Sequence, residues 1–229
     1  MIQDEPTAGR PPARAPRHEG SRDLAMLTRA NHEMRSPLSV ILGVFELLEN
    51  SPGLAPAEAP FVELGHDAAL DLLAQADALR LYSALQRDLI TLEPEPVEVA
   101  PLARDHLEAA CAGLDVDIDP STGDNVRAHC DSGYLGVVLT ALCRQLSLGL
   151  PSRAARPHLV VEAHRDGDRA AVVEVRRADA EAPAAQAAEP AGDLAVTLDN
   201  AYRLVALMGG SILLDVDAGY LALRLPQAG

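Results

Sequence analysis

The sequence predicts an α+β protein in which a two-helix hairpin is followed by a mixed α/β sandwich. Two observations carry this prediction. Apolar residues recur at steps of three and four as far as residue 90, and beyond residue 97 short apolar runs alternate with helical patterns. Of the 229 residues 48% are hydrophobic and only 3% aromatic, so the cores must be built from Leu, Val, Ile and Ala.

The first part of the chain is expected to hold a leader and two long helices. Residues 1–20, rich in Pro, Gly, Arg and Glu, predict a disordered leader. A heptad stripe with one polar position, Asn31, predicts the first helix; turn residues at 50–53 end it, and a second helix runs from about 57 to 90. The apolar sets of the two helices are Leu24, Leu27, Met34, Leu38, Ile41, Phe45 and Leu48, and Phe61, Leu64, Ala68, Leu72, Leu79, Tyr82 and Leu89.

This hairpin would carry more apolar surface than its two helices can cover between them. Pairing with a second copy would bury the remainder. The sequence therefore predicts a homodimer in which two hairpins form a four-helix bundle, with residues 21–92 as the dimerisation domain.

A stiff acidic break at 93–96 separates the hairpin from a second domain, predicted at 97–226. An Ala/Pro/Glu stretch without periodicity, before the last helix, predicts a mobile loop. The predicted elements are a helix near 99–112, strands near 115–119 and 126–130, a helix at 131–148, strands near 157–165 and 169–176, a helix at 194–208, and strands near 211–217 and 220–225.

Charge and cysteine content limit the partners and the compartment. Nineteen basic against 34 acidic residues give a net charge of −15, which disfavours nucleic acid and anionic membranes and leaves proteins as the expected partners, unless the acidity serves only solubility. Cys111, Cys130 and Cys143 form no Cys-x-x-Cys pair, so we expect buried thiols in a reducing cytoplasm. We expect no membrane span, because the sequence has no run of ~18 apolar residues, and no signal peptide, because residues 1–22 lack an apolar middle.

The stretch most informative about chemistry lies in the middle of the first helix, at residues 31–38 (NHEMRSPL). Because Met34 and Leu38 are assigned to the apolar stripe, His32 is expected to point to the bundle flank, where a partner can reach it. An exposed imidazole is largely neutral at pH 7, and its free lone pair could attack a phosphoryl group. The alternative is an exposed helix histidine without chemistry.

The neighbours of His32 suit such a reaction. Glu33 could orient the imidazole or take its proton, and Ser36, one turn later on the same face, could hold a water or a phosphoryl oxygen. Pro37 leaves the carbonyl of Glu33 without its helix partner, so the helix should bend there. No metal site is predicted, and the remaining histidines, with no ligand at metal-binding spacing, are expected to be surface or capping residues, or in the leader: His18, His66, His106, His129, His158 and His164.

The string HEMRSPL, followed by SVILGVFELL, resembles the phosphoacceptor box of sensor histidine kinases, His-Glu-x-Arg-Thr/Ser-Pro-Leu. LEPEPVEVAPL resembles the link to the ATP-binding domain of that family, and the order of elements after residue 97 is similar to that domain, so the resemblance covers roughly residues 22–226. It implies a dimeric bundle whose His32 is phosphorylated from ATP or from the aspartyl phosphate of a receiver domain. It further implies an acid/base role for Glu33 and, for Ser36, help in removing phosphate from a receiver.

The sequence departs from the family at the ATP site. Ala141 stands where the family has an Asn, and Gln145 stands where it has a magnesium-binding Asn. RRADAE at 176–181 replaces Asp-x-Gly-x-Gly, and AVTL at 195–198 replaces Gly-x-Gly-Leu, so no glycine brings the backbone close to a nucleotide. We therefore predict a degenerate ATPase-like domain that binds no cofactor of its own, with Mg²⁺ supplied by a partner receiver domain.

These observations favour a histidine phosphotransferase of a two-component phosphorelay, in which His32 passes phosphoryl groups between receiver aspartates without ATP. The alternatives are a non-enzymatic kinase-derived adaptor that binds a response regulator or a kinase, a divergent histidine kinase, and a phosphatase acting through Ser36. Expected partners are receiver domains, including one in a hybrid histidine kinase, and they are expected to contact Arg35 and Ser39 near His32.

Overall fold

The structure is a computed structural model and divides into two compact units, Met1–Ser83 and Ala84–Gly229. The predicted leader lies outside the described residues except for Glu19 and Gly20, which begin the first helix, and most of the predicted loop before the last helix lies outside them too. The described residues are 19–51, 53–112, 114, 116–119, 125–148, 157–179 and 196–228.

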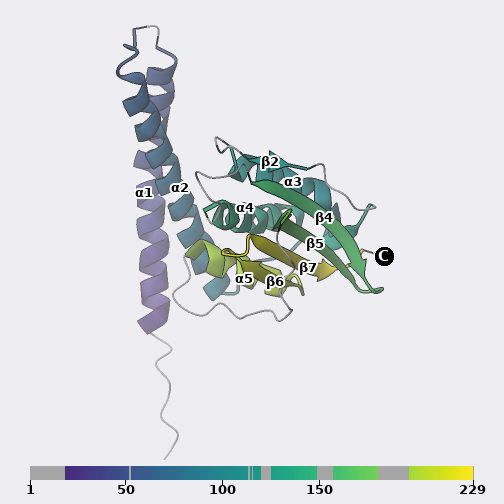
Figure 1. Cartoon of the computed structure of the whole chain (residues 1–229). Helices are drawn as coiled ribbons and strands as arrows, with labels where there is room; N and C mark the ends of the chain where they lie inside the picture. Colours follow the sequence, from purple (N-terminus) through teal and green to yellow (C-terminus); the bar gives the residue numbers. More distant parts are fainter. Residues whose placement is uncertain are drawn as a thin grey trace, which may run out of the picture. The chain divides into compact units, whose positions relative to one another are not determined.

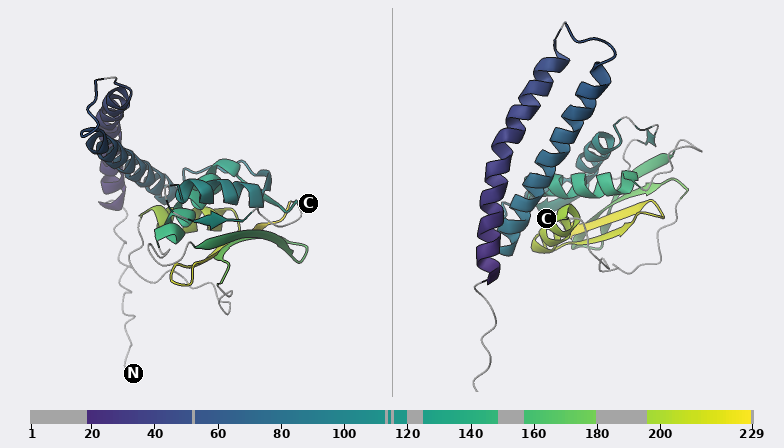
Figure 2. Two further views of the ribbon diagram at one scale, coloured as in Figure 1. Left: turned by 45° about the horizontal axis from the view of Figure 1, so that its top comes forward. Right: turned by 90° about the vertical axis from the view of Figure 1, so that its left-hand side faces the viewer.

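The first unit is the predicted helical hairpin. Helix α1 (Glu19–Glu49) and helix α2 (Ala59–Gln86) lie side by side and are joined by a short turn (Figures 1 and 2). Helix α2 ends at Gln86 and not near residue 90 as predicted, because Asp88 adopts a left-handed φ of 52°. Leu89 N–H then donates to the carbonyl of Ala84, which closes the helix end in the way glycine usually does.

The face of α1 that packs on α2 differs from the predicted apolar stripe. Positions 24, 31, 38 and 45 belong both to the predicted stripe and to the face that packs on α2. Between these positions, however, the packed face has Thr28, Arg35 and Leu42. The intervening members of the predicted stripe remain exposed in the single chain: Leu27 at 43%, Met34 at 46%, Ile41 at 44% and Leu48 at 40%. The apolar face of α1 is therefore wider than one seam, and α2 covers only one side of it.

Small side chains let the two helices approach closely. Three buried residues of α2 recur at every seventh position, Ala69, Ala76 and Ser83. Gly65 leaves its space to the ring of Phe45 on α1. Of the predicted apolar set of α2, Phe61, Leu64 and Leu72 are exposed in the single chain. Helix α2 therefore has an apolar surface that α1 does not cover.

The second unit is an α/β sandwich, as predicted. Within the described residues its main sheet has five strands in the order β2-β4-β5-β7-β6, antiparallel except for the β2–β4 pair. Helices α3, α4 and α5 cover one face of this sheet (Figures 1 and 2). The elements are α3 (Val99–Ala110), β2 (Asp117–Ile118), β3 (Arg127–Cys130), α4 (Ser132–Leu148), β4 (His158–Asp166), β5 (Ala170–Arg177), α5 (Val196–Leu207), β6 (Ser211–Asp215) and β7 (Tyr220–Pro226).

The acidic segment predicted as a break contains a strand. Strand β1 (Glu95–Glu98) pairs antiparallel with β3, and Pro96 lies opposite His129. Proline cannot donate to a strand ladder and is tolerated at a sheet edge, so its presence hid the strand from the sequence pattern. The backbone N–H of Glu93 also donates to Asp131 Oδ2 at 2.9 Å, which anchors the segment to the start of α4.

The core of this unit lies between the helices and the inner face of the sheet. Alternate strand residues such as Val161, Val175 and Leu223 are fully buried there, as are Leu139 and Leu142 of α4. Helix α5 ends at a glycine, as its sequence predicts: Gly209 has a φ of 74°, and Gly210 N–H donates to the carbonyl of Val205. The strand β6 follows at once and pairs with β7.

The three cysteines are free and buried, and burial raises the pKa of each thiol. The pKa of Cys143 rises to about 12, and that of Cys130 to about 11 with a smaller contribution from the nearby carboxylates of Asp131 and Glu95. We therefore expect native protein at pH 8 to react negligibly with a thiol reagent such as Ellman's, and all three cysteines to react after unfolding in guanidinium. Rapid labelling of the native protein would contradict this burial.

The same shifts predict an alkaline loss of stability. The fold favours the neutral thiols, so this stabilisation is complete below the unfolded pKa of 9.0 and decreases as the pH rises toward 11 to 12. The chain has no lysine, so cysteines and tyrosines are the side chains that titrate in this window, and burial of Tyr220 raises its pKa as well. The thermal unfolding midpoint should therefore decrease as the pH is raised from 8.5 to 10.5, and it should decrease less steeply in Cys143→Ala.

Candidate functional site

His32 lies on the flank of the hairpin. Its neighbour Asn31 is buried against α2, and consecutive residues are about 100° apart around a helix, so His32 points away from the seam and is exposed. Thr28, one turn before it, and Arg35, one turn after it, both contact α2. The imidazole is thus held beside the α1–α2 seam, on the side of α1 opposite the exposed apolar stripe.

The two predicted partners of His32 on α1 differ in their angle to it: Glu33 is the next residue, about 100° around the helix, and Ser36 follows one turn later. Glu33 is exposed and pairs with Arg29, with Arg29 Nε 2.9 Å from Glu33 Oε1. Ser36 is also exposed and shares the face of His32, one turn further along. Ser39, predicted to contact a partner, continues that face, and its hydroxyl donates to the carbonyl of Arg35 at 3.0 Å.

Arg35, also predicted to contact a partner, forms an ion pair with Asp77 on α2. Arg80 Nε lies 3.8 Å from the same carboxylate oxygen. The sequence reasoning did not include Asp77 or Arg80, because their closeness to the His32 region depends on how the two helices pair. With Arg29, three arginines and two carboxylates take part in the ion pairs around His32. This local excess of positive charge, in a chain of net charge −15, tolerates an incoming anion.

The positions that correspond to nucleotide motifs in the family lie in the second unit. Ala141 and Gln145 are half-buried on α4, and an alanine side chain offers a metal or a phosphate no ligand. Thr197, exposed at the start of α5, stands where the family has the second glycine of Gly-x-Gly-Leu, and Leu198, which matches the leucine of that motif, is buried in the core. These residues do not fit an ATP–magnesium site.

The end of β5, where the family has its adenine-reading motif, is occupied differently. Arg177 Nε lies 3.1 Å from Asp179 Oδ1, and the backbone N–H of Ala178 donates to the carbonyl of His158 at 2.7 Å. The bond from Ala178 continues the β4–β5 ladder by one residue beyond the Leu159–Arg177 pair. Among the residues that the structure describes, no three His, Cys, Asp or Glu side chains group in a way that could hold a metal ion.

Three of the remaining histidines have partners of their own. His66 Nδ1 lies 2.9 Å from Glu49 Oε1, His106 Nδ1 lies 2.9 Å from Thr140 Oγ1, and His158 Nε2 lies 2.7 Å from Asp119 Oδ1. Each of these contacts ties two neighbouring elements together. These three histidines therefore have structural roles, whereas His32 is exposed.

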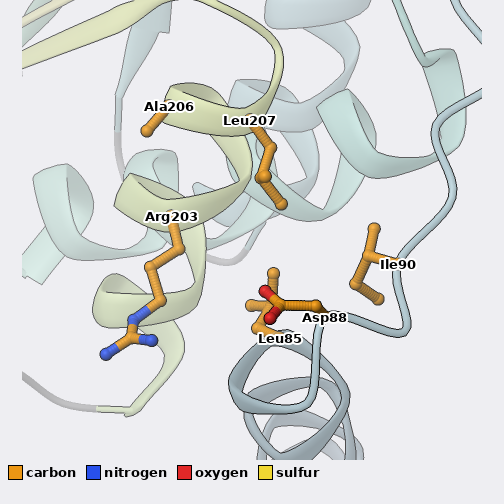
Figure 3. A pocket seen from close by; sticks show the side chains of 6 residues that line it. All are labelled: Leu85, Asp88, Ile90, Arg203, Ala206 and Leu207. Carbon is orange, nitrogen blue, oxygen red and sulfur yellow. The ribbon is translucent and has the colours of Figure 1, made fainter.

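The second unit also carries a hollow of about 390 Å³ that the sequence did not reveal. Figure 3 shows Leu85, Asp88 and Ile90, from the end of α2 and the segment after it, opposite Leu207 of α5. Asp88, which lines the hollow, is in a left-handed turn, and the sequence has no glycine at this position that would have predicted it. Arg203 and Ala206 complete the lining, and Arg203 Nε also lies 2.8 Å from Asp199 Oδ2.

No protein-family model matches the sequence, and no curated protein matches it either. Solved structures do. Full-length ShkA in complex with AMPPNP aligns with a TM-score of 0.62 and 21% identity over 90% of this chain and 46% of its own. The Acinetobacter baumannii histidine kinase AdeS aligns with a TM-score of 0.56 and 14% identity over 86% of this chain and 98% of its own.

These likenesses establish the fold. The chain has the core fold of histidine kinases, a helical hairpin followed by an ATP-binding-like α/β domain. It spans about half of the length of ShkA, 46%. Within the described ranges, none of the helices combines the length and the apolar character needed to cross a lipid bilayer.

Proposed function

We propose that the protein is a histidine phosphotransferase of a two-component phosphorelay. In this proposal His32 accepts a phosphoryl group from the aspartate of one receiver domain and passes it to another, in the cytoplasm and without ATP. The observation that carries it is a contrast between the two units: an exposed His32 stands among arginines and a serine hydroxyl, whereas Ala141 and Thr197 stand where the family has an Asn and a glycine.

The proposed transfer replaces the bond from phosphorus to the receiver aspartate with a bond to His32. A ring nitrogen of neutral His32 donates its lone pair to phosphorus, the P–O bond to the receiver aspartate breaks, and that electron pair returns to the carboxylate. The remaining ring proton passes to Glu33 or to solvent. The receiver would hold Mg²⁺, the expected metal, which would supply charge neutralisation of the phosphoryl oxygens. Ser36 and Arg35 lie one turn from His32 on α1, where they can contact the receiver or its phosphate.

The proposal includes a homodimer. The stripe of Leu27, Met34, Ile41 and Leu48 on α1 remains 40–46% exposed within its own hairpin. A second hairpin packed there would bury this stripe and leave His32, on the other side of α1, open to a receiver.

Transfer to His32 is the test. Purified protein is incubated with Mg²⁺ and receiver domains of the same organism, phosphorylated beforehand with a radiolabelled small-molecule donor, and with no ATP. We expect acid-labile, alkali-stable label to appear on the protein. A parallel incubation with γ-labelled ATP and no receiver should leave the protein unlabelled.

The other outcomes discriminate among the alternatives. Label from ATP alone would establish a divergent kinase. No label from any receiver would reject the transferase and favour the adaptor. Receiver phosphate lost faster than in buffer, with no label on the protein, would indicate a phosphatase, and Ser36→Ala should then slow that loss.

A further inference from the structure

Polar side chains link α1 to α2 at three successive levels around His32. Thr28 Oγ1 and Ser83 Oγ are 2.8 Å apart, the side-chain amide of Asn31 donates to the backbone carbonyl of Ala76, and Arg35 pairs with Asp77. Further along the hairpin apolar residues such as Leu42 and Ala69 close the seam, and another polar contact, between Glu49 and His66, lies at the far end of α1. The three successive links lie on the stretch of α1 that carries His32.

Asn31 is the most deeply buried member of this set on α1, with 4% of its side chain exposed. Burying an amide in an apolar seam is favourable only while its hydrogen bond is kept. Its acceptor is a backbone oxygen, a fixed point on α2, so the bond is kept only at one register and one rotation of α1. Buried asparagines in coiled coils specify register in this way while lowering stability.

A choice of rotation exists because the shared seam positions of α1 have an edge on either side, one mostly polar and one apolar. Thr28, Arg35, Leu42 and Glu49 flank one side of the shared positions 24, 31, 38 and 45, and Leu27, Met34, Ile41 and Leu48 flank the other. Burial of apolar surface alone favours packing the second, more apolar edge on α2. The structure packs the first edge instead, so the polar links must favour the observed rotation.

We infer that Asn31 is a positioning residue: its buried amide, supported by the Thr28–Ser83 link, selects the rotation of α1 that keeps His32 beside α2 and leaves the apolar stripe free. The functional part of this inference rests on the proposed phosphotransfer; the rotation itself does not. Rolling α1 onto its more apolar edge would turn His32 further from Asp77 and Arg80 on α2 and cover the stripe.

Disulfide formation in the full chain reports the rotation without any assay of function. The Thr28→Cys/Ser83→Cys pair reports the observed rotation, and Leu27→Cys/Ser83→Cys reports the alternative; the native cysteines are buried. With Asn31 present, the first pair should oxidise at least tenfold faster than the second. In Asn31→Leu this ratio should fall at least fivefold, and Asn31→Gln, which keeps an amide, should restore part of it.

Two further readouts separate positioning from stability. Asn31→Leu should keep or raise the unfolding midpoint, and should label at His32 with the small donor phosphoramidate at the normal rate. Transfer from a saturating phosphorylated receiver should fall about tenfold, because only that reaction needs the imidazole in one orientation. Leu42→Met, a volume-conserving change at an apolar seam position, is the matched control and should change none of these quantities.

An unchanged cross-linking ratio in Asn31→Leu would overturn the inference, whatever receivers do. If Asn31→Leu fails to fold, Asn31→Ser supplies the comparison in the same two cysteine pairs, and a normal ratio there would overturn the inference equally. A changed ratio with no transfer from any receiver, even in the unaltered protein, would uphold the rotation and reject the proposed phosphotransferase instead.

Discussion

Replacing His32 with Gln is expected to abolish phosphoryl uptake from a phosphorylated receiver, to below roughly a thousandth of the unaltered rate, because the amide lacks the nucleophilic lone pair of imidazole. The side chain is exposed, so the unfolding midpoint should change little. Label on the protein, measured over time at saturating receiver, gives the rate. Circular dichroism during heating gives the stability.

His66→Gln is the matched control, because His66 also lies in the hairpin but pairs with Glu49. It should keep full uptake, at the expense of a small loss of stability from the broken contact. Uptake that survives in His32→Gln, or disappears in His66→Gln, would show that another residue carries the phosphate. Mapping the label to a peptide would then identify it.

A charge in the exposed stripe of α1 is expected to separate the proposed dimer. Ile41 lies within that stripe and is 44% exposed in the single chain. In a four-helix bundle, Ile41→Glu would bury an unpaired carboxylate, which should weaken association by about a hundredfold or more. Light scattering after size-exclusion chromatography should give twice the chain mass of 24.2 kDa for the unaltered protein and one chain mass for the variant at micromolar concentration.

Leu70→Glu provides the comparison. Leu70 is similarly exposed, at 46%, but lies on the flank of α2 away from its apolar surface. It should remain dimeric. A monomeric unaltered protein would contradict the dimer outright, and dissociation of both variants would show that net charge rather than the stripe decides association.

Sequence patterns predicted the second unit well because its signals are local. Strands alternate inward and outward residues, and Gly209 marks the end of α5, so periodicity and turn chemistry placed the elements to within a few residues. Two elements were misjudged for local reasons as well. Strand β1 was not predicted because it contains a proline, and the end of α2 was placed too late because Asp88, and not a glycine, adopts the left-handed conformation there.

The hairpin seam could not be read in the same way. The apolar pattern predicts that Leu27, Met34 and Ile41 face α2. In the structure the edge with Thr28 and Arg35 faces α2 instead, because polar links to α2 favour it. The candidate site shows the same limit. A linear motif identifies His32 and Ser36, but Asp77 joins them only through the pairing of two helices, which no single-helix pattern contains.

The left-handed turn at Asp88 opposes the local energetics of a helix end in two ways. A residue with a Cβ at a φ of 52° is strained relative to glycine, and a carboxylate near the C-terminus of α2 meets the negative end of the helix dipole. Glycine would relieve both, so Asp88→Gly should raise the free energy of unfolding by about 1 kcal/mol. Position 88, at the rim of the hollow lined by α5, is therefore one at which protein engineering can stabilise the fold.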